Sequence, residues 1–208
     1  MEKLIAPQGE KRVLLHCCCA PCSGSIIESM LFSQIRPTLF FYNPNIQPKT
    51  EYLNRKKEVV NYALKMNIDF VDADYDAFRW LKSVEDLSLE PEGGKRCEKC
   101  FDIRLDKTAL HASENNFKVF ATTLGISRWK NLDQITESGM RIATNYPDIS
   151  YWDYNWRKDG GSQRMYELAK QESFYKQEYC GCAFSLRDVN NRRYQEKQSL
   201  VEIGKNRY

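Results

Sequence analysis

The eight cysteines of this 208-residue chain stand in three tight clusters and nowhere else. They are listed here by cluster: Cys17, Cys18, Cys19 and Cys22; Cys97 and Cys100; Cys180 and Cys182. Cysteines that only fill a core would be scattered singly among apolar neighbours, whereas C-x-x-C and C-x-C spacing is typical of metal centres and redox pairs. If these cysteines act at one site, the fold must bring residues near the start, the middle and the end of the chain close together.

The rest of the sequence indicates a cytoplasmic protein. No apolar run approaches the ~20 residues that a membrane helix needs, and Met1 to Gln8 lack the apolar core of a signal peptide. In that compartment a disulfide framework is a poor explanation for paired cysteines. The net charge of +3 neither favours nor excludes a nucleic-acid partner. The more basic segment from Arg187 to Tyr208 fits either phosphate binding or an exposed face without a partner.

The order of apolar segments predicts an α/β fold. Strands are expected at 11–16, 38–42, 69–71, 117–124 and 151–156. Helices are expected at 23–33, from Thr50 onward, and at 77–84, 100–114, 132–144 and 164–172. Alternating strands and helices are typical of a parallel sheet with helices on its faces. We therefore expect a single α/β domain over residues 1–208, with a helical C-terminal extension from about 164 to 208.

The first cysteine cluster follows directly on the first predicted strand. Ligands of open parallel sheets bind beyond the carboxyl ends of the strands, so we expect the cysteine-bearing segments to cover this edge. Neighbouring strand residues point to opposite faces, so at most two of Cys17, Cys18 and Cys19 are expected to share one metal. The following helix, with Ser23 as its expected N-cap, would lower the pKa of Cys22 through its dipole.

The other two clusters each fit more than one chemistry. Cys97 and Cys100 suit one metal or cluster, half of a zinc site, or a redox pair. Cys180 and Cys182 suit two metal ligands or a strained disulfide, and we favour the redox disulfide. Two thiolates of the first cluster and the C-x-x-C pair would make four, the ligand set of structural zinc or of a 4Fe–4S cluster. We expect His16 to be hydrogen-bonded locally rather than to bind metal.

Polar and aromatic residues near these motifs are candidates for a substrate site. Four polar residues follow the second predicted strand, where they could bind a nucleobase or diol or serve as caps: Asn43, Asn45, Glu51 and Arg55. Five aromatic residues could stack on a base or belong to the core: Tyr42, Trp129, Tyr151, Trp152 and Trp156. Arg157, Lys158 and Arg164 fit either a phosphate-gripping loop or a surface turn.

The chain carries, in this order, the motifs HCCCAPC at 16–22, FYNPNI at 41–46, EYLNRK at 51–56, RCEKCFDIRL at 96–105, ATTLGISRWKN at 121–131 and FYKQEYCGC at 174–182. This series of motifs resembles the QueH family of epoxyqueuosine reductases. The resemblance implies iron–sulfur-dependent reduction of epoxyqueuosine to queuosine at the wobble position of tRNA, the last step of queuosine biosynthesis. It also implies a 4Fe–4S cluster, a second mononuclear iron, and a fold similar to HUP or PP-loop domains.

With this resemblance we assign roles to the candidate residues. The 4Fe–4S cluster is assigned to Cys17, Cys18, Cys97 and Cys100, the second iron to Cys19 and Cys22, and a redox-active disulfide to Cys180 and Cys182. The substrate contacts are assigned to Tyr42, Asn43, Asn45, Glu51, Arg55 and Trp129. The expected partners are tRNA carrying epoxyqueuosine in its anticodon loop and an external electron donor, because the chain lacks a glycine fingerprint for nicotinamide. The alternatives are a structural zinc and RNA-binding module and a metal-free thiol-disulfide oxidoreductase.

Overall fold

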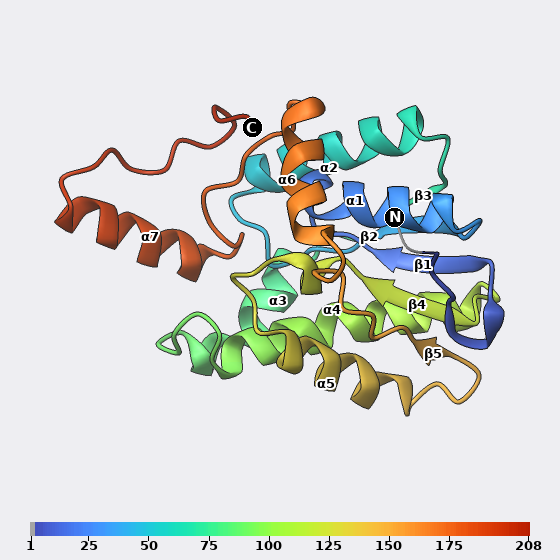
Figure 1. Cartoon of the computed structure of the whole chain (residues 1–208). Helices are drawn as coiled ribbons and strands as arrows, with labels where there is room; N and C mark the ends of the chain where they lie inside the picture. The colour runs from blue at the N-terminus through green and yellow to red at the C-terminus, as the bar shows by residue number, and fades with distance from the viewer. Residues whose placement is uncertain (1–2) are drawn as a thin grey trace.

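The computed structural model describes residues 3–208, so Met1 and Glu2 of the predicted domain lie outside the described residues. The described chain forms a five-stranded sheet in the order β3-β2-β1-β4-β5, and every neighbouring pair is parallel (Figure 1). The strands are β1 (Arg12–His16), β2 (Arg36–Phe41), β3 (Phe70–Asp72), β4 (Val119–Thr122) and β5 (Ser150–Tyr151). The predicted α/β fold class is confirmed.

Helices cover both faces of the sheet (Figure 1). They are α1 (Ala20–Phe32), α2 (Lys49–Lys65), α3 (Ala77–Ser83), α4 (Lys95–Glu114), α5 (Leu132–Ala143), α6 (Gly161–Gln171) and α7 (Ala183–Gln195). Helix α1 packs against α2 and α6 on one side, and α4 packs against α5 on the other. None of the helices in residues 3–208 has the length and apolar character needed to cross a bilayer.

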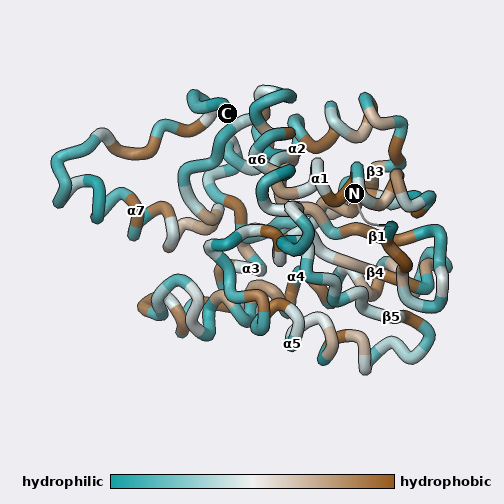
Figure 2. Tube along the Cα trace, in the orientation of Figure 1, coloured by the Kyte–Doolittle hydropathy of each residue, from teal (hydrophilic) through white to brown (hydrophobic). Residues whose placement is uncertain are grey.

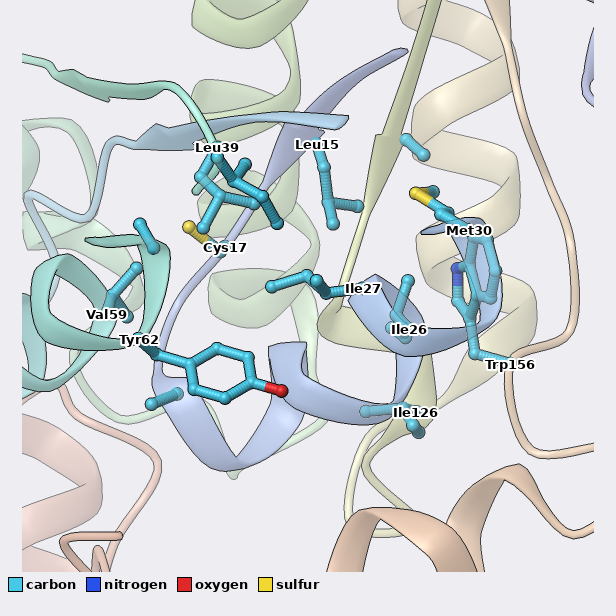
Figure 3. Close-up of a cluster of buried hydrophobic side chains, with 14 of the residues drawn as sticks. Leu15, Cys17, Ile26, Ile27, Met30, Leu39, Val59, Tyr62, Ile126 and Trp156 are labelled. Atoms are coloured by element: carbon cyan, nitrogen blue, oxygen red, sulfur yellow. The ribbon is translucent and has the colours of Figure 1, made fainter. Parts of the chain in front are cut away.

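Side chains of the central strands alternate between two apolar cores. Leu15 and Leu39 point into the core beneath α1 and α2, which Figure 3 shows, whereas Leu14 and Phe40 point into the core beneath α4 and α5. This alternation follows from the two-residue period of a strand that is buried on both faces. Figure 2 shows the contrast with α7, where most residues are hydrophilic and only single hydrophobic ones intervene.

The strand order reverses between β1 and β4. The connection after β1 passes through α1 on one face of the sheet, and the connection after β4 passes through α5 on the other. A crevice opens where neighbouring strands send their connections to opposite faces, and open α/β sheets bind ligands there. The first cysteine cluster directly follows β1 and therefore lies at this switch point.

Four helices begin earlier than the sequence predicts, among them α2 at Lys49 rather than Thr50 and α6 at Gly161 rather than Arg164. Helix α1 starts at Ala20, with Cys19 as its N-cap, so the assignment of Ser23 as the cap is wrong. Pro21 fits this first turn because its missing N–H would have no partner in a helix, and the Ser23 hydroxyl donates to the Cys19 carbonyl oxygen at 2.7 Å. Helix α4 starts at Lys95 rather than Cys100. The last predicted strand is also shorter, since β5 is only Ser150–Tyr151.

Candidate functional site

A cavity of about 400 Å³ lies at the carboxyl edge of the sheet, beside the β1–β4 switch point. Segments that are far apart in the sequence line it: Cys18 and Cys22 follow β1, Lys130 follows β4, and Cys180 precedes α7. The predicted covering of this edge by cysteine-bearing segments is thus confirmed. The volume is within the usual range of small-molecule sites, about 300 to 1,000 Å³.

Three thiols of the first cluster meet at one point. The Sγ atoms of Cys18, Cys19 and Cys22 all lie within 4.8 Å of one another, and those of Cys18 and Cys19 are 3.7 Å apart. Cys17 instead points into the core beneath α1, where Figure 3 shows it, and its thiol donates to the Phe40 carbonyl oxygen at 3.6 Å. Only two of the three consecutive cysteines therefore share the group, as the strand alternation predicts.

The protonation of this thiol group differs from the prediction. Hydrogen bonds with Cys18 and Cys19, followed by burial, raise the pKa of Cys22 well above its usual value, so the expected lowering by the helix dipole is wrong for the metal-free thiol. Hydrogen bonds from Cys19 and Cys22 lower the pKa of Cys18. These hydrogen bonds therefore favour the thiolate of Cys18 over that of Cys22, and a bound metal ion would displace the thiol protons.

The second and third cysteine clusters lie next to each other. Cys97 and Cys100 are one turn apart on α4, and Cys100 packs with Cys182 in an apolar cluster that includes Trp80. The Cys182 thiol accepts a hydrogen bond from the Ser185 amide at 3.4 Å and so caps α7. All eight cysteines are free thiols. The structure therefore brings together two cysteine clusters that are widely separated in the sequence.

The loop that carries the third cluster is fixed by a buried ion pair. Arg55 donates to the carbonyl oxygens of Tyr179 at 3.0 Å and Cys180 at 2.9 Å. Its Nε lies 2.7 Å from Glu51 Oε1, and both side chains are at most 2% exposed. Gly181 has a φ of +137°, and a Cβ there would lie 3.2 Å from the Arg55 guanidinium. Arg55 and Glu51 therefore position this loop.

Two cationic side chains, Arg104 and Lys130, lie near the thiol groups. Burial raises the pKa of Cys100 to about 11, and the neighbouring Arg104 guanidinium opposes this rise. Arg104 also favours the thiolate of Cys18. Burial acts to lower the pKa of Lys130, but interaction with the nearby Cys180 and Cys18 side chains raises it above its usual value. Each cation thus acts on thiols of two different clusters, and both stabilise thiolates at the cavity.

His16 is not available to a metal. It is fully buried, its Nδ1 lies 2.8 Å from the Thr122 hydroxyl, and its Nε2 lies 3.2 Å from the Tyr42 carbonyl oxygen. Burial and the charge of Arg104 lower the pKa of His16 to about 3, so the ring is neutral. Both ring nitrogens are used within the protein, which confirms the expectation that this histidine is hydrogen-bonded locally.

The structure separates the six predicted substrate residues into two groups. Asn45, Arg55 and Trp129 line the cavity. Tyr42, Asn43 and Glu51 are buried and are not among its lining residues. Asn43 instead accepts from Arg104 at 2.6 Å and donates to the Cys17 carbonyl oxygen at 2.9 Å, so it connects α4 to the cysteine loop.

Two buried polar atoms at the cavity have no hydrogen-bond partner within residues 3–208. They are Oδ1 of Asn45 and Nε of Arg104. An unsatisfied buried polar group costs about 1 to 3 kcal/mol, so such groups call for an explanation such as a missing ligand. One is an acceptor and the other a donor, and both belong to residues that line the cavity.

Trp129 differs from the other aromatic candidates because its side chain is 76% exposed. The other four are buried: Tyr42, Tyr151, Trp152 and Trp156. Arg157 holds the loop that carries Trp129, since it donates to the carbonyl oxygens of Gly125, Ser127 and Lys130 at 2.7 to 2.8 Å. Because these hydrogen bonds occupy its guanidinium, they favour a structural role for Arg157 over phosphate binding.

Among the cavity residues that sequence reasoning missed are Arg104, Lys130 and Tyr208. Arg104 had a usable signal, because it lies one helical turn after Cys100 and therefore on the same face of α4. Lys130 and Tyr208 had none, because their positions depend on how loops fold over the sheet.

Comparison with known proteins points to one family. The family model described as epoxyqueuosine reductase QueH matches residues 13–188. A relative of that name from Acinetobacter baylyi is 53% identical over 202 residues, which cover 97% of this chain and 93% of the relative. Relatives of the same name come from Haemophilus influenzae (53% identical, 98% of this chain, 83% of the relative) and Thermotoga maritima (37%, 84% and 90%).

Proposed function

The chain belongs to the epoxyqueuosine reductase QueH family, and we propose that it reduces epoxyqueuosine to queuosine in tRNA, the last step of queuosine biosynthesis. The observation that carries this proposal is a single cavity lined by thiols of two cysteine clusters and by the polar residues Asn45 and Arg104. A redox reaction on a polar nucleoside requires both kinds of group in one place.

The reaction converts an epoxide into an alkene. It consumes two electrons and two protons, and the epoxide oxygen leaves as water. The chain carries no glycine fingerprint for a nicotinamide cofactor. The electrons therefore come from an external donor, and the thiol-rich site receives them.

The spacing of the first thiol group fits a single iron ion. Thiolates at about 2.3 Å from one tetrahedral metal ion lie roughly 3.8 Å from one another. Cys18 and Cys19 meet this spacing at 3.7 Å, and Cys22 completes a set in which no two sulfur atoms are more than 4.8 Å apart. Cys19 and Cys22, the residues first assigned to the second iron, would thus hold it together with Cys18, which was first assigned to the 4Fe–4S cluster.

The 4Fe–4S cluster is proposed for the neighbouring thiols of α4. Cys97 and Cys100 lie one turn apart near the start of that helix, where both can face one cluster. Cys17 was predicted as a further ligand, but its buried thiol points into the core, so the cluster proposed here rests on Cys97 and Cys100. When bound, the cluster supplies electrons one at a time and the separate iron supplies a Lewis acid.

The third cysteine cluster is proposed to act as the redox pair. Cys180 lines the cavity and Cys182 packs against Cys100, so the pair lies between the substrate site and the proposed cluster. Both thiols are free. Their oxidation to a disulfide would release two electrons, the number that one turnover needs.

The remaining cavity residues would bind and orient the substrate. RNA is recognised mainly through unstacked bases, so the modified nucleotide would enter the cavity displaced from the anticodon loop. The Asn45 carbonyl oxygen would accept a hydrogen bond from the nucleoside, and Arg104 Nε would donate one. The exposed Trp129 ring would stack on a neighbouring base.

The proposal is tested in cells that lack their own epoxyqueuosine reductase. The chain is expressed in them, bulk tRNA is digested, and epoxyqueuosine and queuosine are quantified by mass spectrometry. We expect queuosine to replace epoxyqueuosine with the wild-type chain and not with a Cys97→Ser, Cys100→Ser double variant. Epoxyqueuosine that persists with soluble wild-type protein would refute the proposal.

A further inference from the structure

The chain beyond α7 turns back onto the body of the molecule (Figure 1). Residues 204–208, here named the C-terminal strap, run beside the segment that leads to the third cysteine cluster. Tyr208 donates its amide to the Phe174 carbonyl oxygen at 3.0 Å, and the Lys176 amide donates to the Asn206 carbonyl oxygen at 2.8 Å. The pairing is antiparallel, through a bridge between Tyr175 and Arg207.

Further contacts anchor the strap to α2. The Arg207 guanidinium lies 3.2 Å from the Glu58 carboxylate and donates to the Ser173 carbonyl oxygen at 2.8 Å. The Gly204 amide donates to the Tyr175 hydroxyl at 3.1 Å. Gly204 has a φ of +86°, a conformation that favours glycine. The strap is thus held at both of its ends.

These anchors bring Tyr208 to the cavity. Tyr208 is one of the cavity's lining residues and packs with Cys22 against the core beneath α1. Its ring centroid lies 6.4 Å from that of Tyr166, another lining residue. Cys22 lines the same cavity, so Tyr208 and this thiol border one space.

We propose that the C-terminal strap forms the wall of the substrate cavity on the side of Cys22, and that Tyr208 contacts the modified nucleoside there. The inference rests on the proposed function and extends it to a residue outside positions 13–188, the part of the chain that the family model matches. A tyrosine hydroxyl is protonated at neutral pH and can donate a hydrogen bond to a ligand oxygen. Its ring can pack against the nucleoside and exclude water from the thiols.

A strap with a purely structural role would predict different results. In that case, shortening Tyr208 would leave both substrate turnover and the accessibility of Cys22 unchanged. Lys205 offers a matched control in the same strap, because its side chain is 70% exposed and pairs with the exposed Glu202. Thermal unfolding of each variant reports whether the fold is kept.

The test compares Tyr208→Ala, Tyr208→Phe and Lys205→Ala with the wild type. One readout is kcat/KM for tRNA that carries epoxyqueuosine, measured with the reconstituted holoenzyme. The other is the rate at which iodoacetamide alkylates Cys22 in the metal-free, reduced protein, followed by peptide mass spectrometry. We expect Tyr208→Ala to lower kcat/KM about tenfold, the scale of one lost aromatic contact, and to speed alkylation of Cys22. Tyr208→Phe keeps the wall, so its alkylation rate should match the wild type.

If either readout of Tyr208→Ala stays at the level of Lys205→Ala, the proposal is overturned. A wild-type protein that converts no epoxyqueuosine would instead contradict the proposed function. In that case only the alkylation rate tests whether the strap forms the cavity wall. Faster alkylation of Cys22 in Tyr208→Ala supports this part of the proposal, and an unchanged rate overturns it.

Discussion

Arg55 donates a hydrogen bond to the carbonyl oxygen of Cys180 at 2.9 Å and thereby ties the third cysteine cluster to helix α2. The same guanidinium is paired with Glu51 at 2.7 Å, deep in the protein. Arg55 therefore fixes the placement of Cys180 in the cavity together with the Gln47 amide, which donates to the Gly181 carbonyl oxygen at 2.8 Å.

An Arg55→Lys variant should therefore distinguish the effect of loop position on activity from the effect of the positive charge at residue 55. Lysine keeps the positive charge beside Glu51 but cannot reproduce a planar fork that reaches two carbonyl oxygens and a carboxylate. We expect kcat to fall at least about tenfold while iron bound by the first cluster is retained. Arg55→Ala leaves Glu51 buried and unpaired, which costs about 3 to 5 kcal/mol of stability. Chemical denaturation and iron analysis measure the two effects, and an Arg55→Lys variant with wild-type kcat would contradict the positioning role.

The two adjacent residues Cys17 and Cys18 should differ in their importance for metal binding. Cys18 lies in the three-thiol group, whereas Cys17 points into the core. We expect Cys18→Ala to lose iron and Cys17→Ala to retain all of it after anaerobic reconstitution, as measured by iron and sulfide content. Loss of the cluster in a folded Cys17→Ala variant would instead restore Cys17 as a ligand.

Asn45→Ala should weaken substrate recognition. The variant removes the unpartnered acceptor at the cavity and leaves the metal ligands untouched. One lost hydrogen bond to the nucleoside is expected to lower kcat/KM by about tenfold. Asn191→Ala, on the exposed surface of α7, is the matched control. Equal kinetics for the two variants would exclude Asn45 from substrate binding.

Trp129→Ala should weaken the binding of tRNA more than its turnover. Stacking on one base contributes about 1 to 3 kcal/mol, so we expect KM for tRNA to rise roughly tenfold with little change in kcat. Phe78 is a matched control because it is 78% exposed, compared with 76% for Trp129, and is not a cavity residue. If Phe78→Ala raises KM as much as Trp129→Ala does, the stacking role fails.

The fold was predictable because its strands carry a strong local signal. Buried parallel strands are continuous apolar runs, as in Val13 to Leu15, and these runs alternate with helical segments. Helix starts were less predictable. Ser23 has the side chain of a typical cap, but Pro21 extends the helix backward because it fits a first turn that begins at Ala20.

The sequence predicted which types of residue form the candidate site better than it predicted how they are arranged in space. Strand alternation indicated that Cys17, Cys18 and Cys19 would not all meet, but which of them faces the core depends on how the sheet packs. Lys130 and Tyr208 reach the cavity only through loops and a strap whose paths are set by distant contacts such as Arg157 with Gly125. Such long-range contacts leave no pattern in the local sequence from which they could be predicted.

The central claim is tested most directly by assaying purified protein with its substrate. The protein is reconstituted anaerobically with iron and sulfide, supplied with a chemical reductant, and incubated with tRNA that carries epoxyqueuosine. We predict that queuosine appears in the digested tRNA and that removal of the iron by a chelator abolishes its formation. Unchanged epoxyqueuosine with fully loaded protein, or equal conversion by the metal-free protein, would contradict the account.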